Sequence, residues 1–297
     1  MVERSAVSFQ NGRQALCRWQ KPCRIIDVRR HSETMDLGFG GEVADLYHRY
    51  RRGYPSGLIG ACVDAFSLEG DDLVIDLGCG TGQLATPIAP HVRAVIGVDP
   101  EPDMLAHARS AAQDQGVTNV AWMVGSDSDL PLLRSLLAEQ SVGAVTIGQA
   151  LHWMDHEALF AAVGPLLRPG GGVMVVANGI PLWLQDSDWS RALREWLSDW
   201  LGARPANSCG TDNATQQRYR QSLTANGFEV SKVELDYADE LDFDHLLGGI
   251  YSALPVDRLP SPKERPQIAA ELREVLHPYR PYIEQVPVRA LLGTKVA

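Results

Sequence analysis

The chain has 297 residues, of which 45% are hydrophobic, 22% are charged and 7% are aromatic, and its formal net charge is −10. This composition is typical of a globular protein and excludes collagen and a disordered tail. It also excludes a membrane channel, because no apolar stretch approaches the about 18 residues of a membrane span. The acidic balance argues against nucleic acid as a partner, since such a surface needs clustered positive charge.

The N-terminal segment differs in charge from the rest of the chain. Residues 1–31 carry seven Lys or Arg and two acids, and they lack the apolar core of a secretory signal. We expect a basic, loosely ordered extension over residues 1–34 and one main domain over 35–297. A translation start at Met35 and a basic arm that contacts a partner are the alternatives.

Apolar periodicity predicts alternating helices and strands from residue 39 onward. The first two helices are expected over residues 42–52 and 56–66. Five short apolar strands should follow, over 73–77, 94–98, 120–124, 143–148 and 173–177. The helices between them are expected from 83–90, 103–115, 132–139 and 156–167, with a turn at 169–172. Strands without polar alternation are covered on both faces, so this α/β pattern predicts a doubly wound, mostly parallel sheet.

The pattern changes after Asn178. A tryptophan-rich helix is expected over 189–201 and another helix up to residue 226. A strand over 228–237, helices over 242–253 and 263–276 and a final strand over 286–296 should follow. These strands complete a seven-stranded sheet, with a helical insertion at about 180–226 between strands five and six.

A glycine-rich turn follows the first strand and opens a helix. Its glycines are Gly78, Gly80 and Gly82, and Gln83 stands where the dinucleotide fingerprint GxGxxG needs its last glycine. The spacing therefore fails as a pyrophosphate site by one residue.

Two acids at the same edge of the sheet indicate the ligand. Asp76 lies in the end of the first strand, where its carboxylate would repel phosphate and suits an ammonium group. Asp99 ends the second strand, where a carboxylate can accept hydrogen bonds from both ribose hydroxyls. An ammonium group and a ribose without phosphate describe S-adenosylmethionine.

The sequence resembles the class I S-adenosylmethionine-dependent methyltransferases. The resemblance rests on five motifs in the family's order, at residues 74–82, 98–105, 125–131, 149–153 and 167–171. Residues 47–55 look like the N-terminal lid segment of the small-molecule branch that includes trans-aconitate methyltransferase. The resemblance covers about residues 39–297 and implies a Rossmann-like methyltransferase fold with an N-terminal helical lid.

The resemblance also implies cofactor contacts by position. Asp76, Gly78 and Gly80 would line the methionyl part, Asp99 would bind the ribose, and Met104 would pack on the adenine. The full expected cofactor set is Arg51, Asp76, Gly78, Cys79, Gly80, Asp99, Pro100, Met104, Asp127, Ser128 and Gln149. Within this set Asp127 or Ser128 would contact the adenine amino group, and Arg51 would pair with the methionyl carboxylate or simply pack.

His152 is the candidate catalytic residue. It follows the fourth strand at the carboxyl edge of the sheet, and imidazole titrates near neutrality. The alternative is that His152 and Trp153 only brace the following helix. The expected acceptor contacts are Tyr50, Tyr54, His152, Trp153 and Trp183. The helix-spaced tryptophans 189, 196 and 200 could line the same pocket, form core or contact another subunit.

The sequence thus predicts an enzyme that transfers a methyl group from S-adenosylmethionine to O, N or C of a small organic acceptor, in secondary metabolism. Five irregularly spaced cysteines favour reduced thiols in the cytoplasm. No metal, nucleic acid or membrane partner is expected, and a homo-oligomer is left open. The alternatives are a fold-mate that binds the cofactor as a cyclase or regulatory subunit, and an NAD-dependent oxidoreductase.

Overall fold

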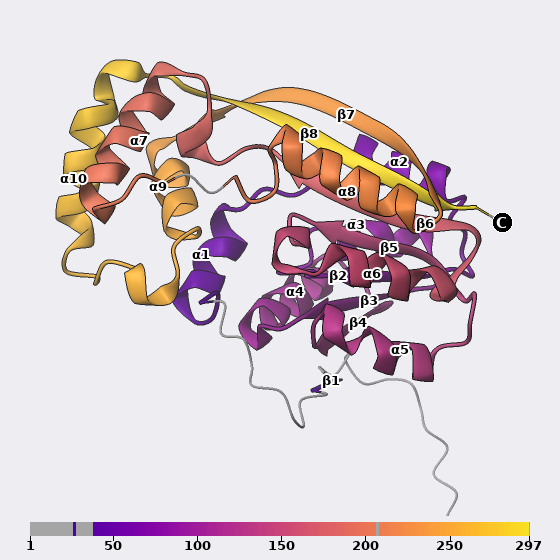
Figure 1. Ribbon diagram of the computed structural model, residues 1–297. Helices are drawn as coiled ribbons and strands as arrows, with labels where there is room; N and C mark the ends of the chain where they lie inside the picture. The colour runs from indigo at the N-terminus through magenta and orange to yellow at the C-terminus, as the bar shows by residue number, and fades with distance from the viewer. Residues whose placement is uncertain (1–25, 28–37, 206–207, 297) are drawn as a thin grey trace, which may run out of the picture.

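The computed structural model describes residues 26–27, 38–205 and 208–296. It is built around one central sheet with helices on both faces and a group of helices at one end (Figure 1). The basic extension expected over residues 1–34 lies outside the described residues, except for the two-residue strand β1 (Ile26–Asp27). Within the described ranges, no helix combines the length and the apolar run that a membrane span requires.

The sheet has the strand order β1-β4-β3-β2-β5-β6-β8-β7. Strands β1 to β6 pair in parallel, whereas β8 is antiparallel to both of its neighbours. Their bounds are Leu73–Leu77 for β2, Ala94–Asp99 for β3, Val120–Val124 for β4, Val142–Gly148 for β5, Leu167–Asn178 for β6, Phe228–Leu241 for β7 and Tyr282–Lys295 for β8. The doubly wound, mostly parallel sheet is confirmed, and β1 adds an eighth strand to the seven expected.

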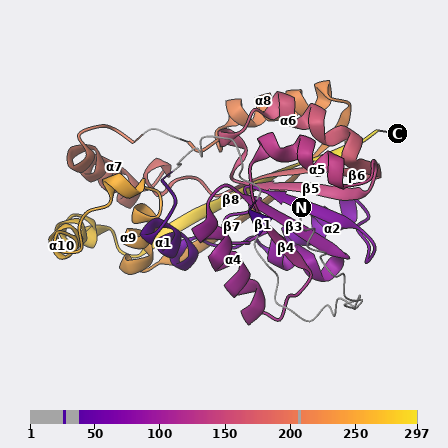
Figure 2. The same cartoon turned by 90° about the horizontal axis from the view of Figure 1, so that it is seen from below.

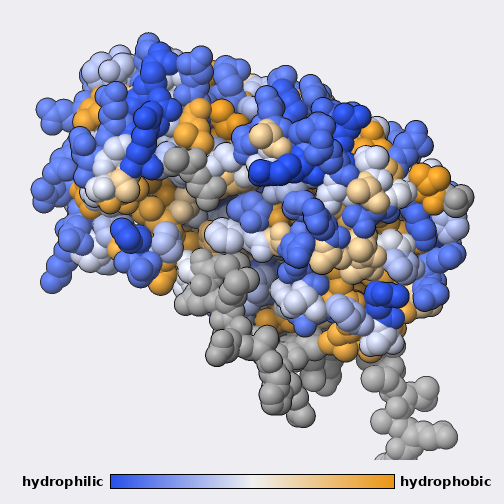
Figure 3. All heavy atoms as spheres, viewed as in Figure 1, coloured by the Kyte–Doolittle hydropathy of each residue, from blue (hydrophilic) through white to orange (hydrophobic). Residues whose placement is uncertain are grey.

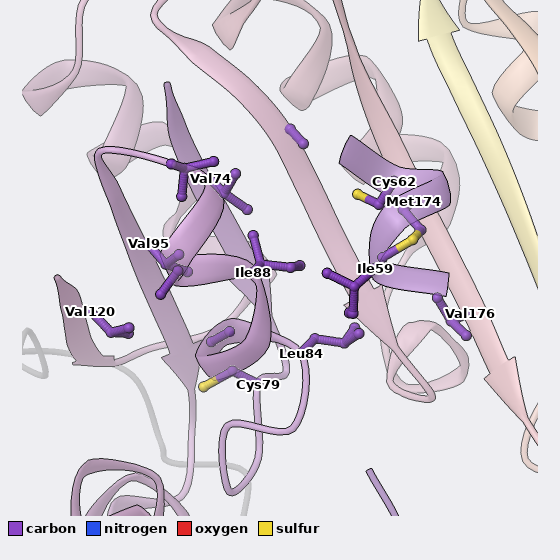
Figure 4. Packing of buried hydrophobic residues seen from close by; sticks show 14 of the residues in the cluster. Ile59, Cys62, Val74, Cys79, Leu84, Ile88, Val95, Val120, Met174 and Val176 are labelled. Atoms are coloured by element: carbon purple, nitrogen blue, oxygen red, sulfur yellow. The ribbon is translucent and has the colours of Figure 1, made fainter. Parts of the chain in front are cut away.

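Helices cover both faces of this sheet because successive strand residues point to opposite sides. On β2, Val74 packs with the cluster that contains α2 (Ser56–Ala65), α3 (Ala85–Ile88) and α4 (Pro102–Asp114), as Figure 4 shows for part of it. Its neighbour Ile75 packs with the cluster of α5 (Leu130–Leu136), α6 (His156–Val163) and α8 (Asn213–Ala225). Figure 2 shows α5, α6 and α8 on the side opposite to α2 and α4. Residues on both faces of β2 are therefore apolar, as the sequence predicted.

Three helices form a separate unit at the end of the sheet (Figures 1 and 2). They are α7 (Asp188–Leu201), α9 (Phe243–Tyr251) and α10 (Arg265–Leu276). Leu193, Leu246 and Leu272 are fully buried in their shared core. Helices α7 and α8 lie between β6 and β7, where the sequence predicted a helical insertion at 180–226, but the two helices pack in different places. Only α7 of that range joins the unit, because α8 packs its apolar face on the sheet, and α9 and α10 come from between β7 and β8.

Helix α1 (Glu42–Tyr50) bridges the helical unit and the sheet domain. Toward the sheet domain, the rings of His48 and His107 stack with centroids 4.8 Å apart, and the Gly41 N–H donates to Asp103 Oδ2 over 2.7 Å. Toward the helical unit, Glu42 forms an ion pair with Arg265 of α10. Helix α1 is therefore held by both the sheet domain and the helical unit. It includes part of the segment for which the sequence predicts a lid.

Candidate cofactor and acceptor site

The glycine turn after β2 is held in a backbone conformation that few other residues adopt. Gly78, Gly80 and Gly82 have φ angles of 64°, 52° and 85°. A Cβ atom on Gly78 would lie 2.4 Å from Cβ of Ala150, and one on Gly82 would lie 2.9 Å from the Trp122 ring. The turn can therefore bend tightly against the start of the following helix only with glycine at these positions.

The Asp99 carboxylate supports this turn from the end of β3. Its Oδ2 accepts a hydrogen bond from the Gly80 N–H over 2.8 Å, and its Oδ1 accepts from the Glu101 N–H over 2.9 Å. Burial raises the pKa of Asp99 to about 6, although both hydrogen bonds oppose that shift. A carboxylate offers about four acceptor sites, so two remain for a ligand with two hydroxyl groups.

The Asp76 carboxylate lies deeper, at 1% exposure. Thr146 Oγ1 donates to its Oδ1 over 2.7 Å, and the Ala85 N–H donates to its Oδ2 over 3.1 Å. Burial raises the pKa of Asp76 to about 7 despite these two hydrogen bonds. A nearby cation would favour the ionised form, so the position suits an ammonium group.

A cavity of about 350 Å³ opens beside the turn. It extends from the glycine turn along α1 to the segment after β6 and to the helical unit. The wall near the turn includes Asp76, Gly78, Cys79, Gly80 and Gln149, and the far wall includes Trp183, Leu241 and Glu284. Figure 3 shows that the surrounding surface in this view is mainly hydrophilic, with smaller hydrophobic areas. The cavity thus connects the candidate cofactor turn to a compartment lined by both polar and apolar side chains.

Comparisons with known proteins agree with this geometry. Residues 74–171 match a family model described as a methyltransferase domain. An uncharacterized methyltransferase of Mycobacterium tuberculosis (strain H37Rv) is 35% identical over 144 residues, which is 48% of this chain and 53% of that protein. A probable S-adenosylmethionine-dependent methyltransferase of Saccharomyces cerevisiae is 29% identical over 126 residues, 42% of each protein. The chain thus spans about half the length of the curated relatives it matches.

The fold agrees with that of a solved structure. The YcgJ protein of Bacillus subtilis superposes with a TM-score of 0.51 at 20% identity, over 82% of this chain and all of that chain. Residues 74–171 therefore form a methyltransferase domain, with the Rossmann-like fold of the class I S-adenosylmethionine-dependent enzymes. The fold inferred from the five motifs is confirmed, whereas the trans-aconitate-like branch stays a prediction.

The methyltransferase domain brings together part of the predicted residue set. Nine of the predicted residues line the cavity: Tyr50, Arg51, Tyr54, Asp76, Gly78, Cys79, Gly80, Gln149 and Trp183. The Tyr54 hydroxyl lies directly over the Gly148 backbone, and the Arg51 guanidinium lies 5.2 Å from the centre of the Tyr47 ring. Tyr50 of α1 and the following Arg51 and Tyr54 therefore line the cavity, and their role as a lid over the ligands stays a prediction.

The residues expected at the adenosyl end lie outside the cavity wall. They are Asp99, Pro100, Met104, Asp127 and Ser128. Asp99 and Met104 are buried, and Tyr47 of α1 lies close to Gly80 above them. Asp127 and Ser128 belong to a short 3-10 turn that Ser126 caps by accepting from the Ser128 N–H. Their contacts with a cofactor stay predictions.

His152 and Trp153 also lie outside the cavity wall. They form a 3-10 turn with Leu151, and their rings are 4.9 Å apart. His152 is half-buried, which lowers the pKa of its imidazole, whereas Trp153 is 46% exposed and contacts Phe39. This arrangement is compatible with the bracing alternative that the sequence left open, and the catalytic role of His152 stays a prediction.

Tryptophans 189, 196 and 200 pack within the helical unit. Trp189 is buried and donates a hydrogen bond from Nε1 to the Ile283 carbonyl, and the rings of Trp196 and Trp200 stack 5.2 Å apart. None of the three lines the cavity. Of the readings that the sequence left open, the structure thus favours core packing.

Sequence reasoning missed many cavity residues, among them three polar ones that carry contacts of their own. Asn178 ends β6, Arg52 follows α1, and Glu284 lies near the start of β8. Arg52 and Glu284 form an ion pair although 232 residues separate them. A polar residue at the end of an apolar strand could have drawn attention to Asn178, but no local pattern predicts the Arg52–Glu284 pair.

Proposed function

We propose that the chain transfers a methyl group from S-adenosylmethionine to O, N or C of a small organic acceptor. The observation that carries this proposal is the single cavity that extends from the glycine turn to the compartment around Trp183. One continuous cavity lets two ligands lie side by side in a fixed orientation, which is the main requirement of an in-line displacement.

The residues around the turn fit the cofactor. S-adenosylmethionine supplies an electrophilic methyl group on its sulfonium when bound. Asp99 retains acceptor sites for a ribose diol, and the buried Asp76 offers a negative charge to an ammonium group. Arg51 lines the same cavity, and its Nε donates a 2.9 Å hydrogen bond to Ser252 Oγ. The other N–H groups of its guanidinium would bind a ligand. We assign Arg51 to the methionyl carboxylate.

Helix α1 and the helical unit complete the proposed site. Tyr50 and Tyr54 would contact the acceptor from α1 and its following loop, and Trp183 from the opposite wall. Their rings supply the apolar surface that small organic ligands bind. A role in secondary metabolism, a cytoplasmic location and a homo-oligomer belong to this proposal and derive from the sequence.

The direct test is transfer of label from S-[methyl-¹⁴C]-adenosylmethionine by the purified full chain to a panel of small phenols, amines, thiols and carboxylic acids. We expect label in a small-molecule product. Binding of S-adenosylhomocysteine without transfer to any panel member would favour the cyclase or regulatory alternative. Reduction of a nicotinamide cofactor, followed by its absorbance, would revive the oxidoreductase.

His152→Ala tests the proposed general base. A half-buried, neutral imidazole can accept a proton at pH 7, and losing such a base slows transfer by about 10²-fold or more. We expect kcat to fall to that extent while the Kd of S-adenosylhomocysteine stays within about twofold. His277→Ala, at an exposed position, is the matched control. Unchanged turnover in His152→Ala would assign His152 to bracing the turn.

A further inference from the structure

Three polar atoms on the cavity wall have no hydrogen-bond partner. They are Arg52 Nη1, Asn178 Oδ1 and Trp183 Nε1, and each is shut off from solvent. All three residues line the same cavity. Buried polar groups in folded proteins are nearly always hydrogen-bonded, and leaving one unpaired costs about 1–3 kcal/mol. Among the described residues, three of the eight buried side-chain atoms without a partner belong to residues that line this one cavity, which indicates that a ligand there supplies their partners.

The Asn178 side chain presents an acceptor. Its Nδ2 donates to the Gly53 carbonyl over 3.0 Å, and its main-chain carbonyl accepts from Gln149 Nε2 over 2.5 Å. Because the Gly53 carbonyl can only accept, the amide must turn its nitrogen toward Gly53. Oδ1 is thereby fixed as the free atom, and it requires an O–H or N–H group from a ligand. Asn178 is only 7% exposed, so this acceptor faces few groups other than a molecule in the cavity.

Arg52 Nη1 and Trp183 Nε1 are hydrogen-bond donors, and neither side chain leaves an uncompensated positive charge in the cavity. The Arg52 guanidinium is paired with Glu284, which is 2% exposed and also accepts from Gln185 Nε2 over 3.0 Å. Glu284 already compensates the charge of Arg52, and the Tyr237 hydroxyl also lies near enough to the guanidinium to raise the pKa of Arg52, so Nη1 suits a neutral oxygen better than a carboxylate. Asp239 lines the same cavity and adds negative charge on this side, whereas Arg51 is assigned to the cofactor carboxylate.

We propose that Arg52, Asn178 and Trp183 form the acceptor subsite and that it takes an uncharged, oxygen-bearing organic molecule. A hydroxyl or amine hydrogen of this molecule donates to Asn178 Oδ1, and carbonyl-type oxygen accepts from Arg52 Nη1 and Trp183 Nε1. Ile180, Leu182 and Leu241 line the cavity as well and contact its apolar body. This inference rests on the proposed methyl transfer, since it assigns Asp76 and the glycine turn to the cofactor.

Four probe molecules test the chemistry of the subsite, with the full chain saturated with S-adenosylhomocysteine. 4-Hydroxyacetophenone carries both a hydroxyl and a carbonyl, acetophenone lacks the hydroxyl, 4-ethylphenol lacks the carbonyl, and 4-hydroxybenzoate carries a charge. We expect 4-hydroxyacetophenone to bind about fivefold more tightly than each of the others in calorimetry, which corresponds to one net hydrogen bond. Tighter binding of 4-hydroxybenzoate, or no binding of any probe, would overturn the proposal.

Trp183→Phe locates the effect, because it retains an aromatic ring and removes Nε1. We expect it to reduce the preference for 4-hydroxyacetophenone over 4-ethylphenol at least about twofold. Trp200→Phe, in the helical unit and away from the cavity, should leave the preference unchanged. S-adenosylhomocysteine should bind both variants as it binds the wild type.

The outcomes separate this inference from the proposed function. If the wild type binds S-adenosylhomocysteine but both variants keep the full probe preference, the subsite assignment is wrong and the methyltransferase proposal stands. If Trp183→Phe weakens S-adenosylhomocysteine and leaves the probes alone, Trp183 belongs to the cofactor. If the wild type does not bind S-adenosylhomocysteine, both proposals fail.

Discussion

The Asp99 carboxylate has two functions in the proposed site. It fixes the glycine turn through the Gly80 N–H, and it retains acceptor sites for a ribose. Asp99→Ala removes both, so we expect the affinity for S-adenosylhomocysteine to fall about 10- to 100-fold, or about 1–3 kcal/mol. Isothermal titration calorimetry measures this directly. Asp244→Ala, at an exposed position of α9, should bind like the wild type. Equal affinities for wild type and Asp99→Ala would remove Asp99 from the cofactor site.

The raised pKa of Asp76 predicts that cofactor affinity depends on pH. Burial raises its pKa to about 7 from 3.8, so between these values the folded chain holds a proton that the unfolded chain has lost. A cofactor ammonium group favours the carboxylate, and binding below pH 7 must therefore release this proton. We expect the affinity for S-adenosylhomocysteine to fall up to about tenfold per pH unit below about 7 and to level off above it.

Thr146→Val provides the matched variant for this pH dependence. It removes the hydroxyl that donates to Asp76 Oδ1 and keeps the size of the side chain. The pKa of Asp76 should then rise, and the midpoint of the affinity profile should shift to higher pH. Calorimetry in buffers of different ionisation enthalpy counts the released protons. A flat profile in both proteins would mean that Asp76 does not titrate with the cofactor.

At the scale of elements, local sequence predicted strands best where apolar runs have clear limits. β2 and β4 occupy the predicted residues, because each is a short apolar run between polar or glycine-rich segments. β6 was predicted too short, since a Pro-Gly-Gly-Gly sequence at 169–172 indicates a turn. In the structure, Leu167 pairs with Val142 and Gly172 with Thr294, so residues 168–171 form a bulge within β6 and do not end the strand.

β7 and β8 are also longer than predicted, and the ends of these two strands depend on each other. β7 continues to Leu241 and β8 begins at Tyr282, and these two residues pair. Residues far apart in sequence determine this register, so neither end is visible locally. The same reason explains why only some residues of the candidate site could be predicted from the sequence. The glycine turn and Asp99 follow from local motifs, whereas the Arg52–Glu284 pair depends on the assembled sheet.

Gly248 of α9 allows α1 to pack closely on the helical unit. A Cβ atom at this position would lie 2.3 Å from the Tyr50 ring. Gly248→Ala should displace Tyr50 and lower the free energy of unfolding by about 1–3 kcal/mol. Urea unfolding measures the change. Gly60→Ala in α2, where no atom lies within 4 Å, should instead stabilise the protein by about 0.5–1 kcal/mol. A neutral Gly248→Ala would show that the α1–α9 contact can relax.

At the scale of the molecule, the cavity lies between two parts with separate cores. The glycine turn belongs to the sheet domain, whose two clusters lie on opposite faces of the sheet. The far wall belongs to the segment after β6, to β7 and β8, and to α9 of the helical unit. The cofactor and acceptor compartments should therefore respond differently to damage in one core.

Leu272→Ala in α10 tests this separation. Leu272 is fully buried in the helical core, so its truncation should cost about 2–5 kcal/mol. We expect faster amide exchange in α7, α9 and α10, measured by mass spectrometry, with β2 to β5 unchanged. S-adenosylhomocysteine should still bind, while methyl transfer falls because the acceptor wall is loosened. Leu133→Ala, in the cluster under α5, should give the converse exchange pattern. Equal acceleration throughout both parts would show that the two cores unfold as one cooperative unit.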